Sequence, residues 1–197
     1  MNATGRSVAV FALLLVSAAG ASAQARTSPQ SAEKAFAAGG RVWMDLSAGD
    51  YRIQAGAGDR VRVEWTYTDP DDVGSFRHEM RVEGRDLTLR TRGPRGGMRV
   101  VVEVPARSDL TVRLGAGDLR ITGVEGSKDL SSWAGNVVVD VGAPDAYASV
   151  EASVTAGDLS ARPFSVDKSG LFRSFSWKGS GRHRLKVRLT AGDLELR

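Results

Sequence analysis

Apolar and polar residues alternate one by one over much of this sequence. Residues 60–67 (RVRVEWTY) place valine, tryptophan or tyrosine at every second position, with arginine, glutamate and threonine between them. The same alternation recurs in residues 99–104, 109–114 and 184–189. A period of two is typical of β-strands that have one buried and one solvated face. Because no 3.6-residue apolar stripe is sustained after residue 24, the pattern predicts an all-β protein.

One segment leaves the type of element open. Residues 28–36 (SPQSAEKAF) fit a short helix, with Ser28 as its cap and Pro29 in its first turn. A short strand or a disordered tail over residues 31–36 fits equally well. Gly39 and Gly40 end the segment in either case.

A second pattern is an octet of the form apolar-x-Ala-Gly-Asp-apolar-x-apolar, which occurs five times with some relaxed positions. The copies start at Leu46, Leu114, Ser132, Val154 and Leu189, so the successive steps are 68, 18, 22 and 35 residues. Steps of 18 and 22 residues suit one turn of a solenoid, and 35 residues suit two turns. One octet in a two-turn step would then be eroded.

The octets predict a β-solenoid or β-roll-like stack of short strands. In this fold, residues 41–105 form hairpins at the N-terminal end, and the eroded turn lies around residues 171–177. An elongated β-sandwich is the alternative, because recurrent turns between short strands predict that architecture too.

The Gly-Asp pair inside each octet is predicted to be a structural turn. Glycine supplies backbone angles that other residues adopt only with strain, and aspartate can accept a hydrogen bond from the N–H two residues on. In the third copy asparagine keeps the acceptor and loses the charge. The turn residues are Gly49, Asp50, Gly117, Asp118, Gly135, Asn136, Gly157, Asp158, Gly192 and Asp193. A further pair, Gly58-Asp59, is out of phase with the apolar positions that follow it, and is predicted not to be a true copy.

Neither a metal site nor a catalytic centre is expected. Calcium-binding β-rolls have a paired Gly-Gly and a residue between glycine and aspartate, which the octets lack. The acidic run 69–74 (DPDDVG) fits an exposed turn better than a calcium loop. His78 and His183 are far apart and are expected to face solvent from strands. A calcium-organised β-roll and a glycan-active enzyme with paired carboxylates remain alternatives, and no cofactor is implied.

The N-terminal segment predicts export from the cytoplasm. Residues 1–23 combine one charge, Arg6, with the apolar run 8–16 and small residues before position 24, as in a cleaved signal peptide. We therefore expect a tail or short first strand over 24–40 and a single β-repeat domain over 41–197. The absence of cysteine excludes disulfides, thiol catalysis and a lipid-modified cysteine. The expected location is the bacterial periplasm or the exterior, without a membrane-spanning segment after signal removal.

The net charge of +4 is spread along the strands. Nucleic acid is therefore an improbable partner for an exported chain, whereas an anionic envelope glycan or lipid, or another envelope protein, is a candidate. The candidate ligand patch combines basic and aromatic side chains near the C-terminus: Arg173, Trp177, Lys178, Arg182 and Arg184. In the competing interpretation the aromatic residues there face the core. The sequence indicates no oligomeric state.

Three stretches together resemble a known bacterial family, the secreted β-strand-repeat proteins called adhesin-like, a domain family of unknown function. They are FAAGGRVWMDLSAGDYRI (36–53), VVVEVPARSDLTVRLGAGDLRITGVEG (100–126) and GSGRHRLKVRLTAGDLEL (179–196). The resemblance covers nearly the whole chain after residue 24. It implies a β-solenoid-like fold in the bacterial envelope and no catalytic residues. The function expected is that of a non-enzymatic binding or scaffolding module at the cell envelope.

Overall fold

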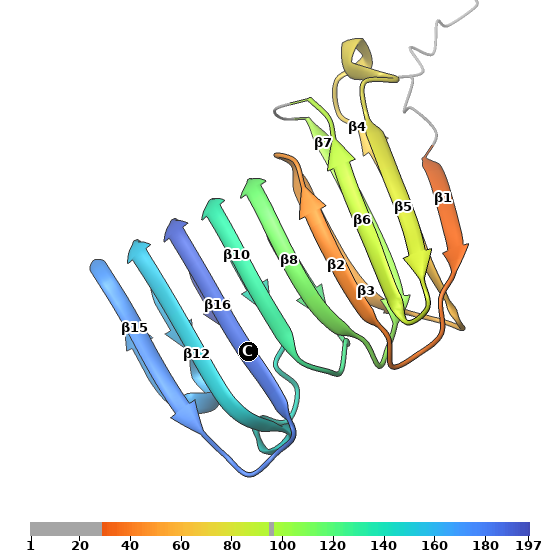
Figure 1. The fold of residues 1–197 in the computed structure, drawn as a ribbon. Coiled ribbons are helices and arrows are strands. Elements are labelled where there is room, and N and C mark those ends of the chain that lie inside the picture. The colour runs from red at the N-terminus through yellow and green to blue at the C-terminus, as the bar shows by residue number, and fades with distance from the viewer. Residues whose placement is uncertain (1–28, 95–96) are drawn as a thin grey trace, which may run out of the picture.

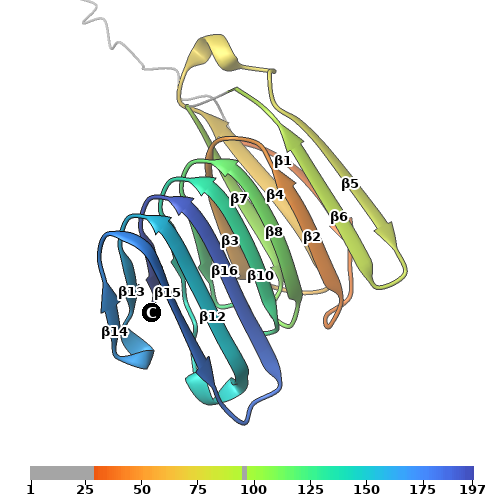
Figure 2. The ribbon, with the colours of Figure 1, turned by 60° about the vertical axis from the view of Figure 1, so that its left-hand side comes forward.

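Two multi-strand β-sheets lie face to face in the computed structural model, which describes residues 29–94 and 97–197 (Figures 1 and 2). Sheet A contains, in spatial order, β1 (Gln30–Ala35), β4 (Arg60–Tyr67), β7 (Met98–Pro105), β3 (Asp50–Gly56), β9 (Leu119–Thr122), β11 (Val137–Val139), β17 (Leu194–Leu196), β13 (Leu159–Ala161) and β14 (Val166–Lys168). Sheet B contains β15 (Leu171–Lys178), β12 (Tyr147–Ala156), β16 (His183–Ala191), β10 (Lys128–Ala134), β8 (Asp109–Ala116), β2 (Arg41–Leu46), β6 (Asp86–Arg92) and β5 (Arg77–Glu83).

The all-β prediction is confirmed. Apart from three short 3₁₀ turns (Pro70–Asp72, Pro144–Ala146 and Arg162–Phe164), the described residues contain no helix. None of them forms a helix long and apolar enough to cross a bilayer. The two open sheets fit an elongated sandwich as well as a solenoid-like stack. The signal peptide expected over residues 1–23 lies outside the described residues.

Alternation along the strands builds one hydrophobic core between the sheets. In β4, Val61 and Val63 have no solvent exposure, and Arg62 and Glu64 lie on the opposite face as an ion pair. The inward residues of both sheets belong to one cluster of buried side chains. Burial of alternate residues on facing sheets is the main source of stability in such an arrangement, at roughly 25 cal/mol per Å² of apolar surface.

Each octet carries the chain from sheet B to sheet A. The five pairs of strands are β2–β3, β8–β9, β10–β11, β12–β13 and β16–β17, and within each sheet these strands run parallel. The first residues of all five octets are register partners in a single row across sheet B: Leu46, Leu114, Ser132, Leu189 and Val154. The sequence phase therefore corresponds to a spatial alignment of the five turns.

The spatial order of these pairs differs from their order along the chain. The last pair, β16–β17, lies between β10–β11 and β12–β13 in both sheets. Figure 1 shows this order for β10, β16 and β12 in sheet B. The prediction of an eroded turn near residues 171–177 is wrong. This segment is β15, which pairs antiparallel with β12 at the edge of sheet B. A step of 35 residues is long enough for the chain to leave the stack, return along its edge and insert one strand earlier.

The N-terminal part also joins the stack. β2 pairs parallel with β8, and β3 pairs parallel with β9, across the 68-residue gap between their octets. The intervening chain adds antiparallel pairs at this end, between β4 and β7 and between β5 and β6. Residues Gln30–Ala35 form strand β1, which pairs with β4. Of the helix, strand and tail that the sequence left open for this segment, the structure therefore has the strand. Sheet A therefore begins before residue 41.

The turn glycines stack directly on one another, and this contact requires glycine. Gly192, with φ of +121°, donates its N–H to Ala156 O at 2.9 Å in the neighbouring turn. A Cβ on Gly192 would overlap the carbonyl oxygen of Gly135 in the turn on its other side. Gly117, Gly135 and Gly157 make equivalent close approaches. Gly58 instead lies between β3 and β4 of the same sheet, where a Cβ would meet nothing within 4 Å.

The aspartate side chains join neighbouring turns. Asp118 Oδ1 accepts hydrogen bonds from the backbone N and the Nδ2 of Asn136, both at 3.1 Å. Asp193 Oδ1 accepts one from Asp158 N at 3.1 Å. These bonds cross between turns that are 18 and 35 residues apart in sequence, whereas the sequence led us to expect a bond within each turn. The stacking brings the next turn's N–H within reach of the carboxylate.

This geometry gives an expectation for Asp193. Asp193→Asn should change the free energy of unfolding by less than about 0.5 kcal/mol, because the amide oxygen can still accept from Asp158 N. Asp193→Ala should cost about 1 kcal/mol, because the acceptor is removed. Urea unfolding of both variants measures the difference. An equal loss in both would mean that the negative charge, and not the acceptor, stabilises the turn.

Candidate functional site

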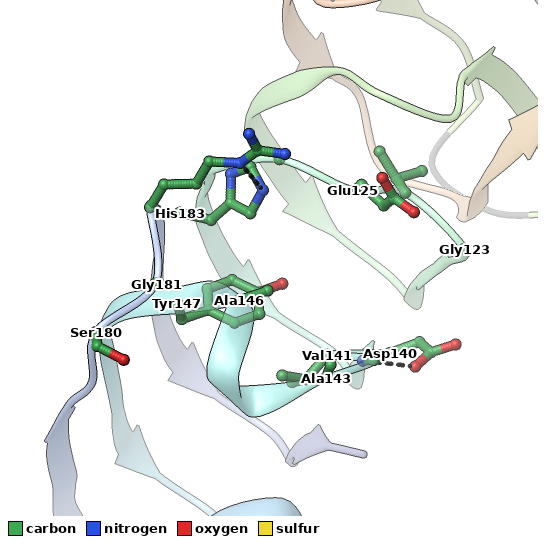
Figure 3. A pocket seen from close by; sticks show the side chains of 14 residues that line it. Gly123, Glu125, Asp140, Val141, Ala143, Ala146, Tyr147, Ser180, Gly181 and His183 are labelled. Carbon is green, nitrogen blue, oxygen red and sulfur yellow. Dashed lines mark hydrogen bonds between the residues drawn. The ribbon is translucent and has the colours of Figure 1, made fainter.

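A large hollow lies on the side of the stack opposite the octet turns. Its volume is about 670 Å³, within the range of small-molecule sites. Three connections line it, as Figure 3 shows: residues 123–126 between β9 and β10, residues 140–146 between β11 and β12, and residues 180–183 before β16. We call this hollow the connection pocket.

The out-of-order strand insertion explains why a pocket exists here. The chain leaving β11 must pass the position of β16–β17 before it reaches β12, which moves this connection away from residues 123–126. The hairpin from β15 then crosses the start of β12, with Gly181 N donating to Tyr147 O at 3.1 Å and Arg182 N to Ala146 O at 3.0 Å. A Cβ on Gly181 would overlap the backbone of Ala146, so the crossing requires glycine.

A buried lysine lies behind the pocket. Lys128, the first residue of β10, is 2% exposed, and its Nζ donates to Gly126 O at 3.2 Å and to Tyr147 Oη at 3.0 Å. No carboxylate of the described residues lies within ion-pair distance of the Nζ. Burial lowers the pKa of Lys128 to about 8, although the charges of Asp140 and other carboxylates oppose this shift.

Tyr147 connects this lysine to the pocket. Its ring lines the pocket, and the Lys128 Nζ lies 5.5 Å from the ring centroid. Burial first, and the charge of Asp140 second, raise the pKa of Tyr147 to about 12. The hydroxyl therefore stays protonated over the physiological range. Its oxygen accepts from Lys128, and this is its one hydrogen bond with a described residue, so the O–H proton has no acceptor among the described residues.

Charged groups of both signs surround the opening. His183 stands at one side (Figure 3), and Arg182 Nε donates to its Nε2 at 3.4 Å. Glu125 and Asp140 stand at the other side (Figure 3), and Asp140 Oδ1 accepts from Gly142 N at 3.1 Å. The apolar part of the lining comes from Val124, Val141, Ala143 and Ala146. The pocket thus combines fixed donors with an apolar wall, which suits the binding of an amphiphilic small molecule.

The sequence led us to expect that both histidines face solvent from strands. In the structure, each is partly enclosed. His183 lines the connection pocket. The His78 ring lies 4.9 Å from that of Trp65 and 5.9 Å from that of Phe76, and partial burial lowers its pKa. Within the described ranges, no group of three or more His, Cys, Asp or Glu residues is arranged to hold a metal ion.

The structure divides the ligand patch expected from the sequence among three places. Arg173 and Trp177 lie on the inner side of β15, where Trp177 contacts the Phe164 ring at 5.1 Å and Arg173 Nε is buried without a hydrogen-bond partner. Lys178 and Arg184 lie together on the outer face of sheet B, both in register with Ser149. Arg182 lies at the connection pocket. The five residues therefore do not form one surface.

Sequence reasoning did not identify Lys128 or Tyr147 as site residues. One signal was available for the lysine. In KDLSSWA (128–134), Lys128 has the same phase as Leu130, which faces the core, so the alternation places a charged residue on an inward position. A charge in the apolar phase of a strand indicates either a buried polar contact or a wrong register. Tyr147 gave no comparable signal, because an inward tyrosine is ordinary core composition.

Neither a family model nor a curated protein matches the sequence. Among solved structures, a protein from Clostridium sporogenes described as a "putative cell adhesion protein" is similar, with a TM-score of 0.56 over 86% of this chain and 99% of that chain. The two proteins share a fold. Their sequences are 13% identical, so the similarity extends to the fold alone.

Two further structures cover similar shares of this chain at lower structural agreement. A protein from Parabacteroides distasonis described as a "putative adhesin" is 14% identical, with a TM-score of 0.28 over 86% of this chain and 70% of that chain. One from Bacteroides fragilis is 9% identical, with a TM-score of 0.27 over 87% of this chain and 98% of that chain. TM-scores below 0.5 do not establish a common fold.

Proposed function

We propose that the protein is a non-enzymatic binding or scaffolding module of the bacterial cell envelope, exported to the periplasm or the exterior, and that the connection pocket holds its ligand. The observation that carries the proposal is the pocket itself, about 670 Å³ in volume. Its lining combines an apolar wall with Tyr147, whose hydroxyl contacts the buried ammonium of Lys128. Fixed polar groups in a mostly apolar hollow are typical of ligand recognition. The shared fold with a protein described as a cell adhesion protein supports a binding role.

The finer description of the fold belongs to the same proposal. We interpret the five aligned strand pairs as turns of a β-solenoid with an inserted last turn, and the glycine–aspartate pairs as its structural turns. A stack of this kind is rigid along its length, because each turn is hydrogen-bonded to the next. Rigidity suits a scaffold that presents one end to a partner. The first residues of strands β12 and β16, Tyr147 and His183, would then hold the pocket in place.

Filling the pocket tests this function. The full chain should bind isolated envelope material, an anionic glycan or lipid fraction or an envelope protein, in a pull-down assay. Ala143→Trp should reduce this binding at least tenfold, because Ala143 lines the connection pocket and a tryptophan there occupies its volume. Ala37→Trp, at an exposed alanine that does not line the pocket, is the matched control and should bind normally.

Two results would contradict the proposal. Equal binding by Ala143→Trp and Ala37→Trp would remove the pocket from the function. Release of reducing sugar from envelope glycan by the unaltered chain, lost on substitution of a carboxylate, would mean that the protein is a glycan-active enzyme. Fractionation of cells that express the full chain tests the location, and recovery in the cytoplasm would contradict export.

A further inference from the structure

We infer that the connection pocket recognises the carboxylate of a small monoanionic ligand with an apolar body, and that Tyr147, held by Lys128, is the group that binds it. The inference rests on the proposed binding function and adds the chemistry of the ligand. Its basis is the pairing of a buried positive charge, which lacks an ionic partner in the described residues, with a hydroxyl that has a proton to donate.

The lysine determines the direction of the tyrosine hydroxyl. An ammonium can only donate, so Tyr147 Oη must be the acceptor in its 3.0 Å contact with Lys128 Nζ. The tyrosine proton must then point away from the lysine. The hydroxyl oxygen extends into the space between the three connections in Figure 3. The pocket therefore contains a donor that is polarised by a positive charge directly behind it, and charge-assisted donors of this kind favour anionic acceptors.

A ligand anion would also supply what the buried charge lacks. Lys128 is 98% buried, and the two contacts that it makes are to neutral oxygens, those of Gly126 and Tyr147. An isolated buried charge is costly unless it is paired. A carboxylate bound to Tyr147 would lie next to this charge, and the guanidinium of Arg182 stands at the same opening as a second donor.

The acidic side of the opening restricts the ligand charge. Glu125 and Asp140 lie across the pocket from His183 in Figure 3, and Arg182 contacts His183. A second negative charge on the ligand would therefore approach a carboxylate. Repulsion between like charges would weaken the binding of such a ligand. The apolar wall, which includes Val124 and Val141, needs an apolar body to cover it. A monocarboxylate with a hydrocarbon or aromatic body meets both conditions.

Benzoate, with benzamide as its neutral isostere and phthalate as a dianion, probes this chemistry in the unaltered full chain. Binding measured by NMR titration should be at least tenfold tighter for benzoate than for benzamide, and at least fivefold tighter than for phthalate. Tyr147→Phe should weaken benzoate at least fivefold, because the hydroxyl is lost. Lys128→Met should weaken benzoate binding tenfold or more. Its matched control is Lys178→Met, at an exposed lysine on the outer face of sheet B, which should bind benzoate like the unaltered chain.

A second measurement does not depend on any variant being folded. A bound carboxylate should raise the pKa of Lys128. Benzoate binding near pH 8.5 should therefore take up protons from the buffer. Calorimetry in buffers of different ionisation enthalpy measures this uptake, because the observed binding enthalpy then depends on the buffer. The charges of Asp140, Asp109 and Glu125 act on Lys128, and Tyr147 Oη contacts its Nζ. Arg182 and His183 line the same pocket as Tyr147.

The outcomes separate the two proposals. Equal affinity for benzoate and benzamide, or carboxylate binding without proton uptake, would overturn the inference. If Ala143→Trp still abolished binding to envelope material in that case, the binding function would stand with a ligand of other chemistry. If benzoate bound as expected while Ala143→Trp and the control bound envelope material equally, the carboxylate site would stand and the envelope function would fail.

Discussion

Gly192→Ala is expected to lower the free energy of unfolding by about 4 kcal/mol, a loss at the upper end for single substitutions. Two costs combine at this position. The φ of +121° lies in a region that favours glycine, and a Cβ there would overlap the carbonyl oxygen of Gly135 in the neighbouring turn. Relief of this overlap requires β16–β17 to separate from β10–β11, which weakens the hydrogen bond from Gly135 N to Ala191 O on the same side.

Gly84→Ala isolates the cost of the backbone angle. Gly84 also has a positive φ, of +60°, but a Cβ on it would meet nothing within 4 Å. This variant should lose only about 1 kcal/mol. Guanidinium unfolding of both variants gives the comparison. If Gly192→Ala lost no more than Gly84→Ala, the close stacking of turns would not contribute to stability, and the turn glycines would serve only local conformation.

Lys128→Met is expected to stabilise the protein more at pH 6 than at pH 10, by about 2 to 3 kcal/mol. Burial lowers the pKa of Lys128 from 10.5 to about 8 in the folded chain. Between these values the unfolded chain binds more protons than the folded chain, so the stability of the unaltered protein rises with pH over this window. Below pH 8 the folded lysine is charged and its full burial cost is present. One pKa unit corresponds to about 1.36 kcal/mol.

Methionine has a similar length and no charge, so the variant lacks this pH dependence. Its loss of the hydrogen bonds to Gly126 O and Tyr147 Oη is a constant offset across the range. The measurement is the difference in unfolding free energy between the two proteins at steps from pH 6 to pH 10. Tyr147, with a pKa of about 12, stays protonated in the folded chain over this range in both proteins. A difference that does not vary with pH would mean that Lys128 titrates normally and is accessible to water.

Much of the local structure follows from the sequence. In β4 and β8, the alternation identified the buried and exposed faces residue by residue, because side chains of a strand point to opposite faces in turn. The octet phase identified which turns align, since a shift of one residue would reverse the faces of every strand after it. The same phase separated Gly58-Asp59, which joins strands of one sheet, from the five pairs that join the two sheets.

The candidate site could not be predicted in the same way. The expected patch treated residues 173–184 as one surface, but β15 is an edge strand with two faces. Two of its aromatic residues, Phe175 and Trp177, turn inward against Phe164. Asp118 and Asp193 bond to the next turn rather than within their own, because the stacking of turns brings a distant N–H closer than the local one.

The sequence by itself determined the all-β class, the two faces of the strongly alternating strands and the alignment of the five octet turns, because these depend on residues that are neighbours along the chain. Only the tertiary structure decided the order of the strands. Whether β16 pairs next to β10 or beyond β12 depends on contacts between residues far apart in sequence, and a spacing of 35 residues permits both. That choice separated the connections, opened the pocket and placed Tyr147 against Lys128. The chemistry of the site therefore follows from strand order, which no local pattern encodes.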